Sequence, residues 1–313
     1  MRELLVADSF RVRLNPKTGA PEVRGLSQHL DRFRTAGREA WCGPHRPSAE
    51  ERRLAAAARR ALLSERRVPS KSVLVFRPPI WSPHEQQLIT EIEHFLHDAR
   101  AQIADYGEGW PRLELLRDGH SPEPKLELKL RPLPELSDTI ELRTAGQIKT
   151  EHPARKGPNV ARYAELNHEL GAEALLLDKR GNVLEGTTTS LVWWPSEPDG
   201  PEPYGGIVAS DRRVRSVTEA LLVEAGGGRL VGTKPNRKRI GQPQPRSASP
   251  GQLAGHGQVV RLEVWAVNAL HGIRVVTAID GVSMPKPNEP RLQWFRDALD
   301  RTWQPVRAEM DQG

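Results

Sequence analysis

The stretch GAEALLLDKRGNVLEGTTTSLVWW, residues 171–194, joins two apolar runs through the turn DKRG and carries one unexpected acid. Glu185 follows an apolar pair, and a glycine and four small hydroxyl residues follow it. A carboxylate entering a buried strand costs free energy unless something pairs with it. We therefore expect Glu185 to face a partner, and an arginine is the commonest partner of a lone buried glutamate.

The composition is that of a globular protein that is somewhat polar. The chain has 313 residues, of which 37% are hydrophobic and 27% charged, which predicts one large domain or two smaller ones. No run approaches the ~18 apolar residues of a membrane span, and MRELLVADSF lacks a signal-peptide core. The single cysteine, Cys42, excludes an internal disulfide and favours a cytoplasmic location.

The net charge of +6 raises the question of nucleic-acid binding. The basic residues are scattered over RRLAAAARR, SERR, DRRVR and KPNRKR, without interleaved aromatics. There is no zinc-finger spacing, RRM signature or heptad. Such a charge distribution is typical of a solvated surface, so nucleic-acid binding is a minor alternative.

Strand and helix patterns alternate without a regular βαβ period, which predicts an α+β fold. The expected strands are Leu4–Val12, Val73–Pro79, Leu113–Leu116, Leu126–Leu130, Thr139–Leu142 and Ala174–Leu177, followed late in the chain by a strand, turn and strand over Leu262–Val276. The expected helices are Ser48–Leu63, His84–Ala104, Val160–Leu170, Val217–Glu224 and Arg291–Trp303, and GAPEVRGLSQHLDRFRTA (19–36) is expected to be a turn leading into a helix.

Arg131–Asp138, RPLPELSD, contains two prolines and breaks both patterns, so we expect a linker there. It would separate an N-terminal domain, residues 1–131, from a C-terminal domain, residues 139–313. Lys234–Gly257 is rich in Pro, Gly, Gln and Arg without periodicity, which predicts a mobile loop or a lid.

Motifs of several common enzyme classes are absent from the sequence. There is no G-x-G-x-x-G after a strand, no P-loop, no H-E-x-x-H and no G-x-S-x-G, and none of the ten histidines has a metal spacing. Four features stand out instead: Lys156 in ARKGPN, Glu185, Ser216–Thr218 before a helix, and Asn268–Leu270 in VNALHG. Taken singly, they are typical of a surface lysine, a salt-bridged acid, a helix cap and a turn.

Taken in order, these features resemble the fold-type-IV pyridoxal-phosphate enzymes, the class IV aminotransferases. That family includes branched-chain and D-amino-acid aminotransferases and aminodeoxychorismate lyase. The resemblance covers nearly the whole chain: DSFRV (8–12), HLDRF (29–33), the stretch 171–194 and EVWAVNALHGIRVVTAIDG (263–281) stand where the family has its motifs. It implies a two-domain α+β fold with the site at the domain junction, and a homodimer.

The resemblance also implies the roles of the cofactor residues. Lys156 would form a Schiff base with pyridoxal 5′-phosphate and carry a proton, and Glu185 would face the pyridine nitrogen. A buried carboxylate that faces a pyridinium forms an ion pair, and this attraction would offset the desolvation cost of burying Glu185. The phosphate would be held by Ser216, Val217, Thr218, Asn268, Ala269 and the guanidinium of Arg32.

The candidate substrate residues are Arg11, Thr188, Thr189, His271 and Arg274. Arg274 could bind a carboxylate bidentately, or it could only pair with an acid such as Asp280. Lys149 and Lys179 lie in an exposed-looking stretch and a turn, and are set aside as the Schiff-base lysine. Trp193 and Trp194 alternate faces on a strand, so at least one belongs to the core.

The sequence departs from the family pattern in several places. The spacing from Lys156 to Glu185 is a few residues short, so the helix between them should be trimmed. The family's Gly-Val-Thr-Arg is Ser216-Val217-Thr218-Glu219 here, which makes Ser216 the least secure phosphate contact. Arg11–Val12 and GPNVARY replace the family's residues at substrate positions, which argues against a standard branched-chain aminotransferase.

Three functions follow as hypotheses. The first is an aminotransferase that moves an amino group between an amino acid and a 2-oxo acid through Lys156. The second is an aminodeoxychorismate lyase that releases 4-aminobenzoate and pyruvate, which Asn-Ala-Leu at 268–270 favours. The third is a non-catalytic or nucleic-acid-binding protein on the same fold, suggested by Ser216, Glu219 and the basic charge. No metal is implied.

Overall fold

The computed structural model describes residues 2–43, 83–119, 123–146, 148–196, 204–237, 240, 244–245, 259–260 and 262–307. The helix expected at 48–63 and the strand expected at 73–79 lie outside the described residues. So does most of the loop expected at 234–257.

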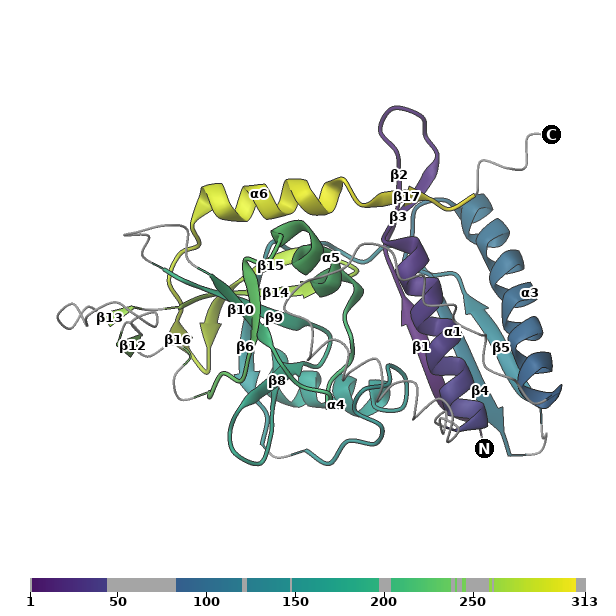
Figure 1. Ribbon diagram of the computed structural model, residues 1–313, viewed down its shortest axis with the longest axis horizontal. Coiled ribbons are helices and arrows are strands. Elements are labelled where there is room, and N and C mark those ends of the chain that lie inside the picture. The colour runs from purple at the N-terminus through teal and green to yellow at the C-terminus, as the bar shows by residue number, and fades with distance from the viewer. Residues whose placement is uncertain are drawn as a thin grey trace, which may run out of the picture.

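The N-terminal half is a three-stranded antiparallel sheet with two helices on one face (Figure 1). The strand order is β1 (Arg2–Ser9), β4 (Arg112–Asp118), β5 (Pro124–Lys129), and the helices are α1 (Leu26–Cys42) and α3 (Pro83–Tyr106). Apolar side chains at helical spacing form the α3 contribution to the core: Leu88, Ile92, Leu96, Ala99 and Ile103. These helices cover the sheet because each presents one continuous apolar stripe to it.

The C-terminal half contains a nine-stranded mixed sheet. Its main path is β11 (Leu230–Thr233), β10 (Gly205–Val208), β9 (Ser190–Pro195), β14 (Leu262–Asn268), β15 (Gly272–Ile279), β6 (Thr139–Thr144), β7 (Glu173–Leu177) and β8 (Val183–Gly186), with β16 (Val282–Ser283) beside β15. The helices are α4 (Val160–Leu170), α5 (Val217–Gly226) and α6 (Glu289–Asp300). The short strands β12 (Gln244–Pro245) and β13 (Val259–Val260) pair with each other.

The two tryptophans of the opening stretch are both core residues. Trp193 is buried on one face of the sheet with residues such as Val208, and Trp194 on the other face with α5 and α6. Trp194 also packs its ring 5.3 Å from that of Phe295. The alternation of side chains along β9 therefore supplies two hydrophobic clusters at once.

The chain returns to its first half at the end. After α6 it forms β17 (Trp303–Pro305), which pairs with β3 (Pro21–Arg24), and β3 pairs with β2 (Val12–Leu14). Val306 is buried in the core of the N-terminal half. Both ends of the described chain therefore lie on the same half (Figure 1), and the stretch proposed as a linker, which has no helix or strand at 131–137, is one of two crossings.

The mixed helices and sheets confirm the predicted α+β class. The helix expected at Val160–Leu170 has those bounds, whereas the last helix begins and ends earlier than expected. It begins after Asn288, whose side chain accepts a hydrogen bond from the Arg291 amide, and Trp303 belongs to β17 instead. The first expected strand is divided into β1 and β2 by a break after Ser9.

Candidate active site

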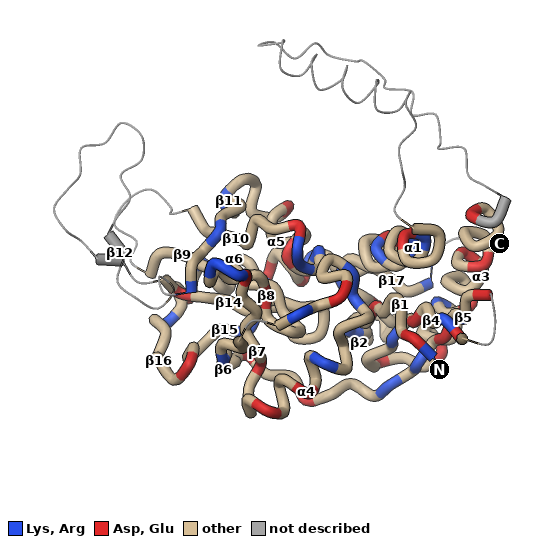
Figure 2. Tube along the Cα trace, turned by 90° about the horizontal axis from the view of Figure 1, so that it is seen from below, with Lys and Arg blue, Asp and Glu red and all other residues tan. Residues whose placement is uncertain are grey.

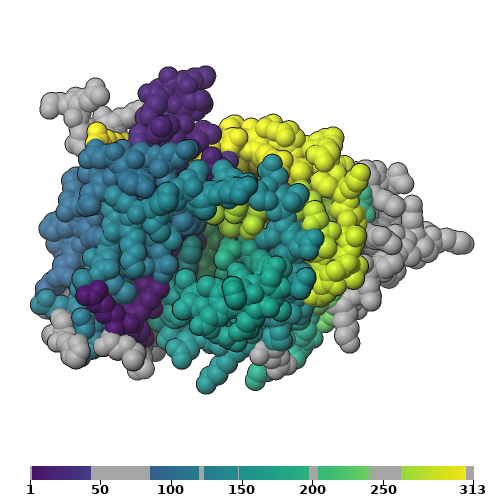
Figure 3. All heavy atoms as spheres, turned by 180° about the vertical axis from the view of Figure 1, so that it is seen from behind, coloured from purple at the N-terminus to yellow at the C-terminus, as the bar shows by residue number. Residues whose placement is uncertain are grey.

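A cavity of about 380 Å³ lies at the junction of the two halves, where the surface is hollowed (Figure 3). Twelve of the thirteen site residues expected from the sequence line it: Arg32, Lys156, Glu185, Thr188, Thr189, Ser216, Val217, Thr218, Asn268, Ala269, His271 and Arg274. Arg11 is not among the lining residues, because its guanidinium lies over the Trp303 ring, 5.9 Å from the ring centre. The fold thus gathers residues that are up to 242 positions apart, as Arg32 and Arg274 are.

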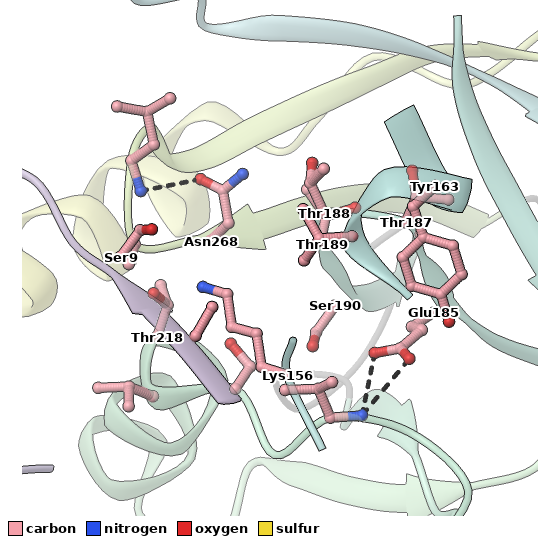
Figure 4. Close-up of a pocket in the computed structure, with 18 of the residues that line it drawn as sticks. Ser9, Lys156, Tyr163, Glu185, Thr187, Thr188, Thr189, Ser190, Thr218 and Asn268 are labelled. Atoms are coloured by element: carbon pink, nitrogen blue, oxygen red, sulfur yellow. Dashed lines mark hydrogen bonds between the residues drawn. The ribbon is translucent and has the colours of Figure 1, made fainter. Parts of the chain in front are cut away.

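Lys156 lies in the loop between β6 and α4 and is anchored to β1 through its backbone. Its carbonyl accepts a hydrogen bond of 2.8 Å from the Ala7 amide. The amine is directed into the pocket, toward the side on which Thr218 and Asn268 lie (Figure 4), and it makes no hydrogen bond or ion pair with the residues described. Burial lowers the pKa of Lys156 to about 8, partly opposed by the Asp8 carboxylate. At neutral pH a usable fraction of this amine is therefore uncharged.

Gly157 allows the lysine loop to approach β1. Its φ is +145°, and a Cβ atom there would lie 2.8 Å from Val6 Cα and 3.0 Å from the Leu5 carbonyl oxygen. Because both neighbours are backbone atoms of a paired strand, neither the loop nor the strand can shift freely.

Replacing Gly157 with alanine is expected to lower the free energy of unfolding by about 1–3 kcal/mol and to displace Lys156 from the pocket. Urea denaturation measures the first effect. The matched control is Gly146→Ala, since a Cβ at Gly146 meets no atom within 4 Å. Equal stability of the two variants would contradict the close approach.

Asp8, His29 and Arg32 form a buried network behind the lysine. Arg32 Nε and Nη2 each donate to Asp8 at 2.7 Å, and His29 Nδ1 lies 2.9 Å from Asp8. Burial favours a raised pKa for Asp8, but Arg32 and His29 outweigh it and hold that pKa well below its usual range. We expected the fork of Arg32 to meet phosphate; in the structure it is engaged by Asp8, and Nη1 donates to the Arg215 carbonyl.

Glu185 lies at 6% exposure in β8 and has a single hydrogen-bond donor among the described residues. That donor is the Val214 amide, 3.2 and 3.4 Å from its two carboxylate oxygens (Figure 4). Burial raises the pKa of Glu185 to about 8, against the lowering by this amide and by Arg213. Glu185 forms no ion pair with an arginine, the usual partner of a lone buried glutamate, in the described structure. A cationic or hydrogen-bonding group of a ligand would therefore stabilise its charged form.

The stability of the ligand-free protein should therefore depend on pH through Glu185. Between about pH 4.5 and 8 the folded protein keeps a proton on Glu185 that the unfolded chain has lost. The free energy of unfolding contributed by this group consequently falls as pH rises, by up to about 1.4 kcal/mol per pH unit. We expect Glu185→Gln to gain stability relative to the wild type from pH 5 to 8 in urea denaturation. A difference independent of pH would contradict this.

The hydroxyl run after Glu185 is held by a second buried acid, Glu173. Its carboxylate accepts hydrogen bonds from the Thr188 amide at 2.9 Å and hydroxyl at 2.8 Å, and from the Thr189 hydroxyl at 2.7 Å. Arg274 also donates to Glu173, at 3.2 Å. Gly186 leaves room for this contact, since a Cβ there would lie 2.4 Å from Glu173 Oε1.

Arg274 therefore pairs with Glu173, and not with the acid that the sequence suggested. Asp280 is bound instead by Arg237 and by the Thr144 hydroxyl, each at 2.6 Å. The Nε of Arg274 is buried and has no hydrogen-bond partner in the described structure. An anionic group in the pocket could supply one.

Two backbone turns close the end of the pocket toward which the lysine amine points. Ser216 caps α5 by accepting a hydrogen bond from the Glu219 amide at 3.2 Å, so its hydroxyl serves the helix. Val217 and Thr218 follow on the pocket wall, where the helix N-terminus favours an anion. Asn268 accepts from the amides of the two residues that end its own turn, at 3.1 and 2.9 Å, which fixes the shape of that turn.

Sequence reasoning missed several pocket residues, chief among them Arg131. It opens the stretch that we interpreted only as a linker, and it donates to the Trp110 carbonyl at 3.0 Å and the Ser9 hydroxyl at 3.2 Å. The lining residues missed also include Arg112, Arg155 and Tyr163. Among the residues that line the cavity, Glu185 is the only acid. The pocket therefore suits an anionic ligand that presents a cation or a donor to Glu185.

His271 adds a neutral group to this wall. Burial and the nearby Arg274 lower the pKa of His271 to about 4, so the ring is uncharged at neutral pH. Its Nδ1 accepts a hydrogen bond from the Ser137 amide at 3.2 Å, which assigns the ring proton to Nε2.

Outside the pocket, the described part of the chain offers no other obvious cofactor chemistry. Within that part, no three His, Cys, Asp or Glu residues are grouped to hold a metal ion, and none of the described helices is long and apolar enough to cross a membrane. Lys and Arg are interspersed with Asp and Glu along the described chain (Figure 2).

Comparisons with known proteins give the fold but little sequence identity. No family model and no curated protein matches the chain. A branched-chain amino acid aminotransferase of T.th., complexed with 4-methylvaleric acid, has a TM-score of 0.59 at 15% identity, over 96% of this chain and 89% of that one. A hypothetical aminotransferase from Mycobacterium tuberculosis, with alpha-ketoglutarate and PMP bound, has a TM-score of 0.57 at 14% identity, over 95% of this chain and 88% of that one.

A putative 4-amino-4-deoxychorismate lyase from Legionella pneumophila has a TM-score of 0.56 at 14% identity, over 95% of this chain and 90% of that one. Aminotransferases and a lyase thus share this architecture with our chain over nearly its whole length. The chain has the fold of the class IV aminotransferases, the fold-type-IV enzymes.

Proposed function

We propose that this protein is a pyridoxal-phosphate-dependent enzyme, and specifically an aminotransferase acting on an amino acid and a 2-oxo acid. One observation carries the proposal: a lysine amine and a buried carboxylate, each lacking an ionic partner in the described structure, line the same cavity. Lys156 and Glu185 are the two groups that this cofactor requires, a nucleophilic amine and an acid for its ring nitrogen.

The rest of the pocket fits the same cofactor. The N-terminus of α5, at Ser216, Val217 and Thr218, would supply backbone N–H groups and the Thr218 hydroxyl for a phosphate. Asn268 and Ala269 form the facing turn. Arg32 adds positive charge nearby while it remains paired with Asp8.

The cofactor, when bound, supplies an electron sink that stabilises negative charge at the substrate Cα. Lys156 would move the proton at that carbon, because its lowered pKa of about 8 lets the amine both accept and release one near neutral pH. Glu185 would hold the ring nitrogen in its protonated form. The arginines of the wall, among them Arg131 and Arg274, would orient the carboxylate of an amino acid or a 2-oxo acid.

The absorption spectrum of purified protein with added pyridoxal phosphate tests the proposal. We expect a band in the region of ~400 nm, which the cofactor shows when it is joined to a lysine amine, and its loss on borohydride treatment. Transfer of an amino group to 2-oxoglutarate or pyruvate should then be measurable. A protein that stays colourless and binds DNA in a salt-sensitive manner would instead support the non-catalytic alternative.

A lyase acting on aminodeoxychorismate is the second candidate. The Asn268-Ala269-Leu270 turn and the likeness to the Legionella structure favour it, and the residues proposed for the cofactor would serve both reactions. Release of pyruvate from aminodeoxychorismate, without any 2-oxo acid acceptor, would identify the lyase. We further propose a homodimer, as the resemblance implies, and sedimentation of the purified protein tests it.

A further inference from the structure

Two arginines flank Val214, the donor of Glu185, and Arg213 is the buried one of the two, whereas Arg215 is exposed. Arg213 lies at 7% exposure and is close enough to Glu185 to lower the pKa of that carboxyl. Yet the two form no ion pair, because the guanidinium is held elsewhere. Nε and Nη2 donate to the Val208 carbonyl at 3.0 and 2.7 Å, and Nη1 lies 3.3 Å from the Ser190 hydroxyl.

The acid that holds Arg213 is Glu219, in the first turn of α5. Arg213 Nη2 donates to Glu219 Oε1 at 2.5 Å, and both side chains are 8% exposed. The second oxygen, Oε2, is buried without a hydrogen-bond partner in the described structure. A buried ion pair with an unsatisfied oxygen is a poor source of net stability, because the desolvation of both charges offsets their attraction.

We propose that Glu219 is a positioning residue for Glu185: it retains Arg213, and so keeps the Glu185 carboxylate free for the cationic group of a ligand. Without the acid, the guanidinium could turn about the adjacent Val214 and pair with Glu185. The ligand would then have to displace a cation that is already bound. The proposal rests on the proposed function for the identity of that ligand, but its geometry belongs to the protein alone.

The position of Glu219 supports a role beyond capping α5. Its amide is bound by Ser216, so the helix is capped by that serine and not by the glutamate side chain. The glutamate instead reaches back across the turn to the loop that carries Arg213 and Val214. The Glu219 side chain therefore binds the arginine that directly precedes the donor of Glu185.

The first experiment measures pyridoxal phosphate binding by absorbance titration in the wild type, Glu219→Gln, and Glu219→Gln combined with Arg213→Gln. The single variant is expected to bind pyridoxal phosphate at least ~10-fold more weakly, which corresponds to the loss of about 1.4 kcal/mol of binding free energy. The double variant removes the released cation, and the glutamine that replaces Arg213 keeps an N–H for the Val208 carbonyl. We expect it to recover to within about threefold of the wild type.

A matched control separates this effect from the general loss of a buried ion pair. Glu263 and Arg291 form one at 2.9 Å, with Glu263 fully buried, and neither lines the cavity. Glu263→Gln should lower the thermal midpoint without changing cofactor affinity. If Glu219→Gln folds poorly, Glu219→Asp keeps the charge but shortens its reach, and should bind with an affinity between those of the wild type and the glutamine variant.

The second experiment needs no cofactor. The carboxyl carbon of Glu185 is followed by ¹³C NMR in the ligand-free protein, assigned by its absence in Glu185→Gln. We expect its pKa to fall in Glu219→Gln, as Arg213 approaches, and to rise again in the double variant. Glu219 itself raises the pKa of Glu185, so the loss of its charge in Glu219→Gln also lowers that pKa. Glu219→Asp keeps the charge but shortens its reach, so a fall of the Glu185 pKa in that variant reports the approach of Arg213 alone.

The two experiments distinguish the failure of the inference from that of the proposed function. If the wild type does not bind pyridoxal phosphate but the Glu185 titration shifts as expected, the proposed function fails and the positioning role stands. An unchanged titration in Glu219→Gln, or a double variant no different from the single one, overturns the positioning role.

Discussion

Lys156→Ala is expected to lose turnover by on the order of 10⁴-fold or more, and to show no band near ~400 nm that borohydride can remove. Two functions disappear together, because the same amine would bind the cofactor and move the proton at the substrate Cα. The loss should not reflect unfolding, since removing a desolvated amine does not destabilise the fold. The thermal unfolding midpoint should therefore be at least as high as in the wild type.

Lys149→Ala is the matched control for this variant. Lys149 lies in the same region of the sequence but is exposed, and it does not line the cavity. Its band and its turnover should equal those of the wild type. A Lys156→Ala protein that is still yellow and reducible would transfer the role of the lysine to another residue.

The second large effect is expected for Glu185→Gln: retained binding of the cofactor to Lys156 with turnover lower by roughly 10³-fold or more. The glutamine is the same size and can still accept from Val214, but it carries no charge to hold a proton on the ring nitrogen. Steady-state kinetics should show the loss in kcat, with the affinity for cofactor changed much less.

Glu165→Gln is the control for charge removal near this wall. Glu165 lies on the exposed side of α4, where it pairs with Arg162, and its loss should leave turnover unchanged. Near-normal turnover of Glu185→Gln would remove the assigned role of Glu185 and with it the main support for the cofactor.

Local pattern was enough for much of the fold. Val160–Leu170 has its apolar residues at helical spacing, and Gly171 follows in a left-handed conformation that ends the helix. The β7–β8–β9 region follows from apolar runs divided by DKRG and by the hydroxyl turn. Such features depend on neighbours within a few residues, so they can be predicted from the sequence alone. The resemblance carried the same information further, to the list of pocket residues.

Contacts between segments that are distant in the sequence could not be predicted from local pattern. Asp8 takes the fork of Arg32 because β1 and α1 pack side by side, which no spacing reveals. Arg131 lines the pocket with its guanidinium bound to the Trp110 carbonyl and the Ser9 hydroxyl. Arg11 lies outside the lining because β17 returns to the first half and places Trp303 beside its guanidinium. Each is a consequence of chain crossings, so the sequence could name the residue type but not its partner.

Glu185 illustrates the difference between what the sequence determined and what the tertiary structure decided. By itself the sequence determined that a carboxylate enters a buried strand beside a glycine and four hydroxyl residues, and that a cost must be met. The tertiary structure decided how: it places only the Val214 amide, among the described residues, against the carboxylate, and it turns the neighbouring Arg213 toward Glu219. The physical reason is that desolvation follows from local hydrophobicity, whereas pairing depends on which distant charges the fold brings within a few ångströms.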